Sequence, residues 1–182
     1  MDSTSDLEKT AAGDAAAFAR LVEAQQARVF GYLGRLGLDA ATSEDIAQDT
    51  FLRVWRHARS FDPRLGAAST WILTIARNLA LTHFARAARR GEVADDAAAA
   101  QAPCSAPHPD AALERRQQRA RLNAALDQLS PSERSLLAAS YVEGLDLAEI
   151  ARLEGCSKGA AKARLHRARA KLKQIIMERD DA

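Results

Sequence analysis

The sequence predicts an all-α protein of two small helical domains joined by a flexible linker, with a helix-turn-helix as the C-terminal domain. Of its 182 residues 47% are apolar but only 5% are aromatic, and glycines (9) and prolines (5) are few, which favours helices over a β-sandwich. Apolar residues recur every three or four positions over most of the chain, the spacing of one helix face. Residues 91–112 interrupt this pattern with three prolines and no Lys or Arg.

The N-terminal block, residues 10–90, predicts three main helices. The first carries an apolar stripe over residues 18–36 and ends at a glycine. The second starts near residue 43 with acids in its first turn and stops before Pro63, because proline disfavours a helical residue ahead of it. The third covers about residues 69–90, where basic residues fill the last turn before a glycine.

The C-terminal block, residues 113–177, follows an acidic Ala/Pro linker at 91–112, which has too few large apolar residues to offset the entropy of ordering it. Each predicted helix of this block begins at a capping residue. Ser130 and Asp146 are each followed three residues later by Glu, as in a capping box, and Ser157 caps the last helix. Two helices joined by a short turn with Gly are typical of a helix-turn-helix.

The last helix concentrates positive charge in a chain whose formal net charge is only +2. The acid-free segment 157–173 holds seven cations: Lys158, Lys162, Arg164, Arg167, Arg169, Lys171 and Lys173. Phosphate neutralisation drives DNA affinity, and Ala163, at the centre of the outer face, lets the backbone approach the bases. The predicted DNA-reading set is Lys158, Lys162, Ala163, Arg164, Arg167 and Lys171. The alternative is an ordinary solvated basic face.

The helix at 69–90 repeats this pattern more weakly. Its polar or basic positions are Arg77, Asn78, Thr82, His83, Arg86, Arg89 and Arg90. Arginine can bind phosphates, while Asn and Thr can hydrogen-bond base edges. From spacing alone, a polar outer face explains these residues equally well.

The helix near 43–60 has an outer face that runs from acidic to basic. Its residues include Asp45, Gln48, Asp49 and Arg53. Asp49 and Arg53 are four apart, so the face can stabilise itself by an ion pair. The functional alternative is a docking surface for a protein partner.

Catalytic and metal-binding motifs are missing from the sequence. It has no Gly-rich phosphate loop, no H-E-x-x-H and no G-x-S-x-G, and Cys104 with His108 would supply only two metal ligands. We therefore expect no enzyme activity, no metal and no cofactor.

No apolar run reaches the ~18–20 residues of a membrane span, the N-terminus is acidic, and the two cysteines suggest no disulfide scaffold. This pattern predicts a cytoplasmic protein without membrane insertion.

Five segments together resemble the extracytoplasmic-function (ECF) class of sigma-70-type sigma factors. In the N-terminal block they are SEDIAQDTFLRVW at 43–55 and TWILTIARNLA at 70–80. In the C-terminal block they are LSPSER at 129–134, LAEIA at 147–151 and KARLHRAR at 162–169. Two blocks in this order, with a linker between them, make the resemblance specific.

The resemblance implies a protein that binds core RNA polymerase and directs it to promoters. It implies a polymerase-docking surface made by Asp45, Gln48, Asp49 and Arg53. It implies that the −35 element is read by Lys162, Ala163, Arg164 and Arg167. It also implies that the −10 element lies against Arg77, Asn78, Thr82, His83 and Arg86. The loop that includes Ala68 and Ser69 would hold a flipped-out base, the linker would thread through the polymerase, and an anti-sigma factor would control the protein. Two other readings remain open, a stand-alone helix-turn-helix transcription regulator and a protein-binding helical adaptor.

Overall fold

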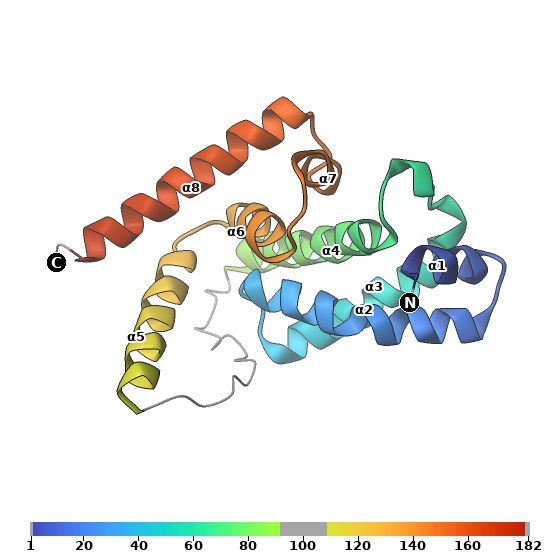
Figure 1. Ribbon diagram of the computed structural model, residues 1–182, viewed down its shortest axis with the longest axis horizontal. Coiled ribbons are helices and arrows are strands. Elements are labelled where there is room, and N and C mark those ends of the chain that lie inside the picture. The colour runs from blue at the N-terminus through green and yellow to red at the C-terminus, as the bar shows by residue number, and fades with distance from the viewer. Residues whose placement is uncertain (1, 92–108, 181–182) are drawn as a thin grey trace.

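A computed structural model describes residues 2–91 and 109–180, and every regular element in these two ranges is a helix (Figure 1). The all-α prediction is therefore confirmed. The elements are α1 (Ser3–Ala11), α2 (Ala15–Arg35), α3 (Ala40–His57), the 3-10 turns η1 (Ala58–Ser60) and η2 (Pro63–Leu65), α4 (Ala68–Arg90), α5 (Pro109–Leu126), α6 (Pro131–Leu137), the π-helical turn η3 (Ala138–Val142), α7 (Leu147–Leu153) and α8 (Lys158–Asp180).

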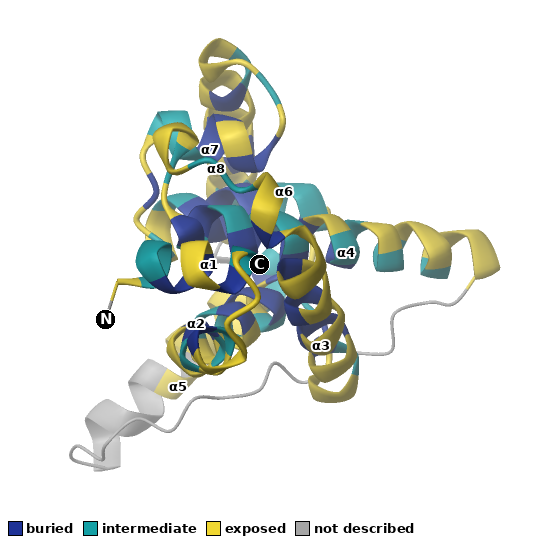
Figure 2. Cartoon of the chain, turned by 90° about the vertical axis from the view of Figure 1, so that its right-hand side faces the viewer, coloured by how far each residue is buried: buried dark blue, intermediate teal, exposed yellow. Residues whose placement is uncertain are grey.

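The N-terminal half is a bundle in which α4 packs against α1, α2 and α3. The predicted stripe of α2 is buried, with Leu21, Val29 and Leu33 fully shielded from solvent. The last turns of α4 project from the body and carry mostly exposed residues, as Figure 2 shows. Gly91 then ends α4 with a left-handed backbone (φ 70°), as the sequence predicted.

Helix α1 is an element that the sequence reading did not predict. Its N-cap Asp2 accepts a hydrogen bond from the Thr4 amide at 3.0 Å, and the Asp6 carboxylate pairs with Arg20 at 2.9 Å. Leu7, its one large apolar residue, is fully buried. A single leucine among polar residues gives no periodic pattern, so only packing against α2 reveals this helix.

The C-terminal half confirms the predicted capping residues. Capping boxes open α6 at Ser130 and α7 at Asp146, and the Ser157 hydroxyl accepts from the Ala160 amide at 3.2 Å at the start of α8. The predicted helix after Ser130 differs in one respect, since its second part is the π-helical turn η3. In α8, Ile175 is buried and Ile176 is exposed.

The predicted linker, residues 91–112, lies outside the described residues over 92–108. Its last four residues already belong to α5, which begins at Pro109. Proline is well suited to the first position of a helix, because its missing N–H has no partner there in any case.

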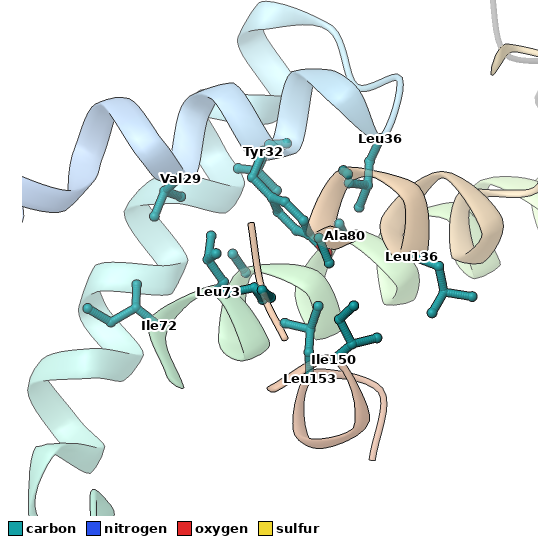
Figure 3. Close-up of a cluster of buried hydrophobic side chains, with 14 of the residues drawn as sticks. Val29, Tyr32, Leu36, Ile72, Leu73, Ala80, Leu136, Ile150 and Leu153 are labelled. Carbon is teal, nitrogen blue, oxygen red and sulfur yellow. The ribbon is translucent and has the colours of Figure 1, made fainter. Parts of the chain in front are cut away.

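The two halves pack against each other through α4, which contacts α6 and α7. In Figure 1, α2 and α3 lie on one side of α4, and α7 lies on the other. Figure 3 shows Tyr32 of α2, Leu73 of α4 and Leu153 of α7 in one cluster of buried side chains. The two helical domains that the sequence predicts therefore also contact each other directly in this arrangement.

No helix within residues 2–91 and 109–180 combines the length and the apolar character needed to cross a bilayer.

The N-cap of α7 makes the stability of the helix-turn-helix depend on pH. The backbone amides of Glu149 and Ala148 donate to Asp146 and hold the pKa of its carboxyl below the ordinary value of 3.8. A lowered carboxyl pKa stabilises the fold above 3.8, and this contribution is lost as the pH falls through the folded-state value. Asparagine caps equally well without titrating. We therefore expect Asp146→Asn to lose less stability than the wild type between pH 6 and pH 3, measured by urea unfolding; equal losses would contradict the assignment.

Candidate nucleic-acid interface

The first turns of α8 present a cationic face to solvent. Lys158, Lys162, Ala163, Arg164, Arg167 and Lys171 are all exposed, as the sequence predicts. On the opposite side of the helix, Ala161, Leu165 and Ala168 are buried. The pattern of small and apolar residues on one side thus fixes which side chains point outward.

The turn before α8 fixes its angle to α7. The amide of Cys156 donates to the carbonyl of Ala151 at 2.9 Å, and Gly155 adopts a left-handed conformation (φ 60°) that suits glycine. Ala151 and Ile150 are buried in the same core as α8. The result is a rigid helix pair of the kind that can insert its second helix into the major groove.

Two cations of the α8 face have acidic partners. Lys171 pairs with Glu133 at 2.9 Å, and the Nη1 of Arg164 lies 3.8 Å from the Glu154 carboxylate. Partial burial raises the pKa of Glu133, but hydrogen bonds from Lys171 and the Ser130 amide outweigh it, so the net pKa is lowered. Both cations remain 46% exposed, so a phosphate can compete for them.

The outer face of α4 is the second polar surface. Asn78, Thr82 and Arg86 are exposed and His83 is half-buried. A shallow hollow on this face is lined by Asn78, Leu81, Thr82, Ala85, Arg86 and Arg89. The Thr82 hydroxyl donates to the Asn78 carbonyl at 2.7 Å, which leaves its lone pairs to accept from a ligand.

Arg77, which the sequence places among the polar positions of α4, does not lie on this outer face in this arrangement. Its side chain is only 8% exposed, and its Nη2 lies 2.6 Å from the Glu154 carboxylate, whose own side chain is fully buried. Arg77 Nε also donates to the Ser135 hydroxyl at 3.0 Å. The physical reason is that α6 and α7 pack on α4 and bury this side chain. The polar positions along a single helix do not show which other helices will cover them.

The residues expected in a base-holding loop, Ala68 and Ser69, instead form the start of α4. Ala68 is fully buried and Ser69 is half-buried, so neither is openly available to a base. The Thr70 hydroxyl donates to Glu149 of α7 at 3.0 Å.

The outer face of α3 is exposed, as predicted. Asp45, Gln48, Asp49 and Arg53 all face solvent. Among the ion pairs of the described ranges, none joins Asp49 to Arg53, so the face is not self-neutralised in the way that the spacing suggests.

Sequence reasoning missed the buried polar cluster of Tyr32, Arg77, Ser135 and Glu154. The Tyr32 hydroxyl and the Ser135 hydroxyl are 2.8 Å apart, and burial raises the pKa of Tyr32 well above its ordinary value, so it stays protonated. One local signal was present. Glu154 is the C-cap of α7, where a negative charge interacts unfavourably with the helix dipole. A carboxylate at this position therefore indicates a cationic partner from elsewhere in the fold.

Within the described part of the chain, no group of three His, Cys, Asp or Glu side chains is placed to hold a metal ion.

Two protein-family models match the chain in order. The model for sigma-70 region 2 matches residues 21–90, and the model for sigma-70 region 4 matches residues 119–172. The first covers α4 and the α3 face, and the second covers the helix-turn-helix.

Curated relatives match over nearly the whole chain. The ECF RNA polymerase sigma factor SigK of Mycolicibacterium vanbaalenii is 32% identical over 87% of this chain and 81% of its own length. The ECF RNA polymerase sigma factor RpoE of Cereibacter sphaeroides is 34% identical over 88% and 87%, respectively. The ECF RNA polymerase sigma factor SigL of Mycobacterium tuberculosis is 33% identical over 92% and 93%.

Solved structures share the fold. CnrH, in complex with the cytosolic domain of CnrY, aligns with a TM-score of 0.67 over 96% of this chain and 97% of that chain, at 22% identity. The sigma factor RpoE of Bartonella quintana, in complex with the anti-sigma factor NepR, aligns with a TM-score of 0.63 over 88% and 96%, also at 22% identity.

Proposed function

Because the chain belongs to the ECF class of the sigma-70 family of RNA polymerase sigma factors, we propose that its two halves divide promoter recognition between α4 and α8. As a sigma factor, it binds core RNA polymerase and directs transcription initiation at specific promoters. In this proposal, residues 10–90 bind the polymerase and the −10 element, and residues 113–177 bind the −35 element. The segment between them connects the two within the polymerase.

The observation that carries the proposal is the exposed cationic face of α8 on a rigid helix-turn-helix. Lys158 and Lys171, at its edges, neutralise phosphates and set the register of the helix on the duplex. Lys162, Arg164 and Arg167 reach base edges of the −35 element, where a guanidinium can bind guanine through two hydrogen bonds. Ala163 lets the helix lie close to the groove floor.

The outer face of α4 contributes the second contact. Asn78 and Thr82 supply hydrogen-bonding groups for bases, and Arg86 supplies a charge for phosphate. His83 lies beside them. Trapping an unstacked base costs a few kcal/mol, roughly, and the start of α4 at Ala68 and Ser69 is the proposed receptor for that base. No step in this scheme needs a catalytic group, and we propose that the chain has no enzymatic activity of its own.

The exposed α3 face is the proposed polymerase-docking surface. We expect Asp49→Ala to weaken association with core polymerase by about 1–2 kcal/mol, or about five- to thirtyfold, because the substitution removes an interfacial carboxylate and leaves its cationic partner on the polymerase unpaired. The measurement is a titration of labelled core polymerase with the full chain. Glu8→Ala, which removes an exposed acid from α1, is the matched control and should bind normally. Normal affinity of Asp49→Ala would move the docking surface elsewhere.

We also propose that an anti-sigma factor controls this protein in the cytoplasm. The support is the structure of the Bartonella quintana sigma factor RpoE with the anti-sigma factor NepR, whose sigma chain has this fold. Exposed apolar side chains on η3 and α8 offer a contact surface for such a partner. They are Tyr141, Val142, Ile176 and Met177.

Run-off transcription on a pooled promoter library tests the proposed function. With core polymerase and this chain, transcripts should start downstream of a shared −35 and −10 pair, and without the chain they should not. A stand-alone regulator would instead protect a specific site from nuclease with no polymerase present. A protein-binding adaptor would show almost no salt-dependent DNA affinity.

A further inference from the structure

An open apolar hollow lies where the C-terminal half of α8 passes η3 and the end of α6. Its volume is about 270 Å³, and its apolar lining is Leu137, Tyr141, Leu172, Ile176 and Met177. Tyr141 and Met177 are 66% and 55% exposed, so the hollow opens to solvent and not into the core. None of the residues that line it belongs to the predicted DNA-reading set of α8.

The same hollow carries two cations, Arg169 and Lys173, which are about one turn of α8 apart. The Arg169 guanidinium lies over the Tyr141 ring, 4.9 Å from its centroid, and donates to the Ser140 hydroxyl at 3.2 Å. These neutral contacts hold the guanidinium in place without cancelling its charge. Within the described ranges, no acidic side chain forms an ion pair with Arg169 or Lys173, and none lines the hollow.

The π-helical turn η3 places the aromatic ring at this position. Tyr141 and Val142 of this turn are exposed, while Ala138 and Ala139 are buried. Turns of π-helix are rare and occur frequently at functional sites. The turn thus supplies an exposed ring that holds a cation at the edge of an apolar hollow.

We propose that the hollow binds a single-chain anionic amphiphile, a fatty-acid carboxylate, as a monomer. The carboxylate accepts charge-assisted hydrogen bonds from Arg169 and Lys173. The alkyl chain lies along α8 against Leu172, Ile176 and Met177. From residue 169 to residue 177 the helix rises by about 12 Å, which sets the length of alkyl chain that the hollow can cover.

The size and charge of the hollow favour this ligand over other occupants. Sites for drug-sized molecules measure about 300–1,000 Å³, so this smaller hollow suits one alkyl chain better than a ring system. A partner α-helix is about 10–12 Å across and could insert only single side chains. A second copy in a symmetric contact would bring Arg169 and Lys173 against the same two cations. Amphiphile binding does not depend on the proposed function, although it uses part of the surface proposed for an anti-sigma factor.

The test is a titration of the full chain with decanoate, below its micelle-forming concentration, followed by NMR of carbon-13-labelled methionine methyl groups. Met1 and Met177 are the two methionines of the chain, so Met177 reports on the hollow and Met1 is an internal control. The Met177 resonance should shift saturably, and the Met1 resonance should not. Octanoate should bind more weakly, by about two- to fourfold for each CH₂ removed. Decyltrimethylammonium, which has the same alkyl chain and a positive head group, should bind about tenfold more weakly or less.

Two pairs of variants at exposed side chains locate the head group and the alkyl chain. Arg169→Gln should weaken decanoate binding by about three- to tenfold, as expected for one partly exposed charge-assisted hydrogen bond. Its control, Arg35→Gln, removes an exposed arginine from α2 and should bind decanoate normally. Ile176→Ser should weaken binding by about fivefold or more, whereas Leu65→Ser, at an exposed leucine of η2, should not.

Several outcomes would overturn the site. The first is a Met177 resonance that does not respond to decanoate, or that responds equally to decyltrimethylammonium. Another is a Met177 resonance that moves when the ligand-free chain is diluted, because a second copy would then occupy the hollow. A response only to vesicles of anionic phospholipid would indicate a membrane surface, and a response only to an acidic amphipathic peptide would indicate a protein partner.

Discussion

Replacing Arg164 by alanine is expected to lower promoter-directed transcription by about 5- to 150-fold, which corresponds to about 1–3 kcal/mol for a lost arginine–base contact. The Arg164 side chain is 46% exposed on the outer face of α8, and its Nη1 lies 3.8 Å from the Glu154 carboxylate. Alanine is the best helix former, so α8 keeps its structure. The loss should be greatest on promoters that carry the preferred base at one −35 position.

The measurement is run-off transcription with core polymerase, run beside a polymerase-binding titration. Arg119→Ala removes an exposed arginine from α5 and should change neither result. Lys162→Ala should behave like Arg164→Ala on transcription. If both variants lost polymerase binding to the same degree as transcription, the role of this face in reading DNA would be wrong.

The second large effect concerns stability. Ile72→Ala should lower the free energy of unfolding by about 2–5 kcal/mol, because it removes three buried carbon atoms and leaves a cavity. Ile72 is fully shielded in α4, the helix that contacts both halves, and Figure 3 shows it at the edge of the buried cluster. A typical domain has only about 5–15 kcal/mol of stability in total, so this loss is substantial.

Urea unfolding followed by circular dichroism measures the change. Leu65→Ala is the control, because Leu65 is 65% exposed in η2 and its truncation should alter stability by less than about 0.5 kcal/mol. A similar urea midpoint of unfolding for wild type and Ile72→Ala would show that the packing of α4 does not stabilise the core.

The sequence predicted best those features that depend on neighbours three or four residues away. The capping boxes at Ser130 and Asp146 are of this kind, because both partners of each hydrogen bond lie in one turn of helix. The same holds for the exposed face of α8, since Leu165 and Ala168 fix its buried side. Local spacing therefore predicted which face of α8 is exposed.

Features that arise between distant segments could not be read from spacing. Arg77 is polar and was expected on the surface, but its partner Glu154 comes from the other half of the chain. Helix α1 depends on one buried leucine, and η3 depends on how α6 meets its neighbours. The exposure of Asn78, Thr82 and Arg86 could thus be predicted from spacing, whereas the burial of Arg77 could not.

The ion pair between Arg77 and Glu154 has a practical consequence for protein engineering. Mutagenesis campaigns commonly rank variants by heat resistance, and any change that tightens the contact of α7 with α4 would score well in such a screen. Such variants would also hold α4 and α8 more firmly in one relative position, so a higher melting temperature is no measure of how well they start transcripts. Optimisation of this regulator should therefore score output in a living reporter strain before melting temperature.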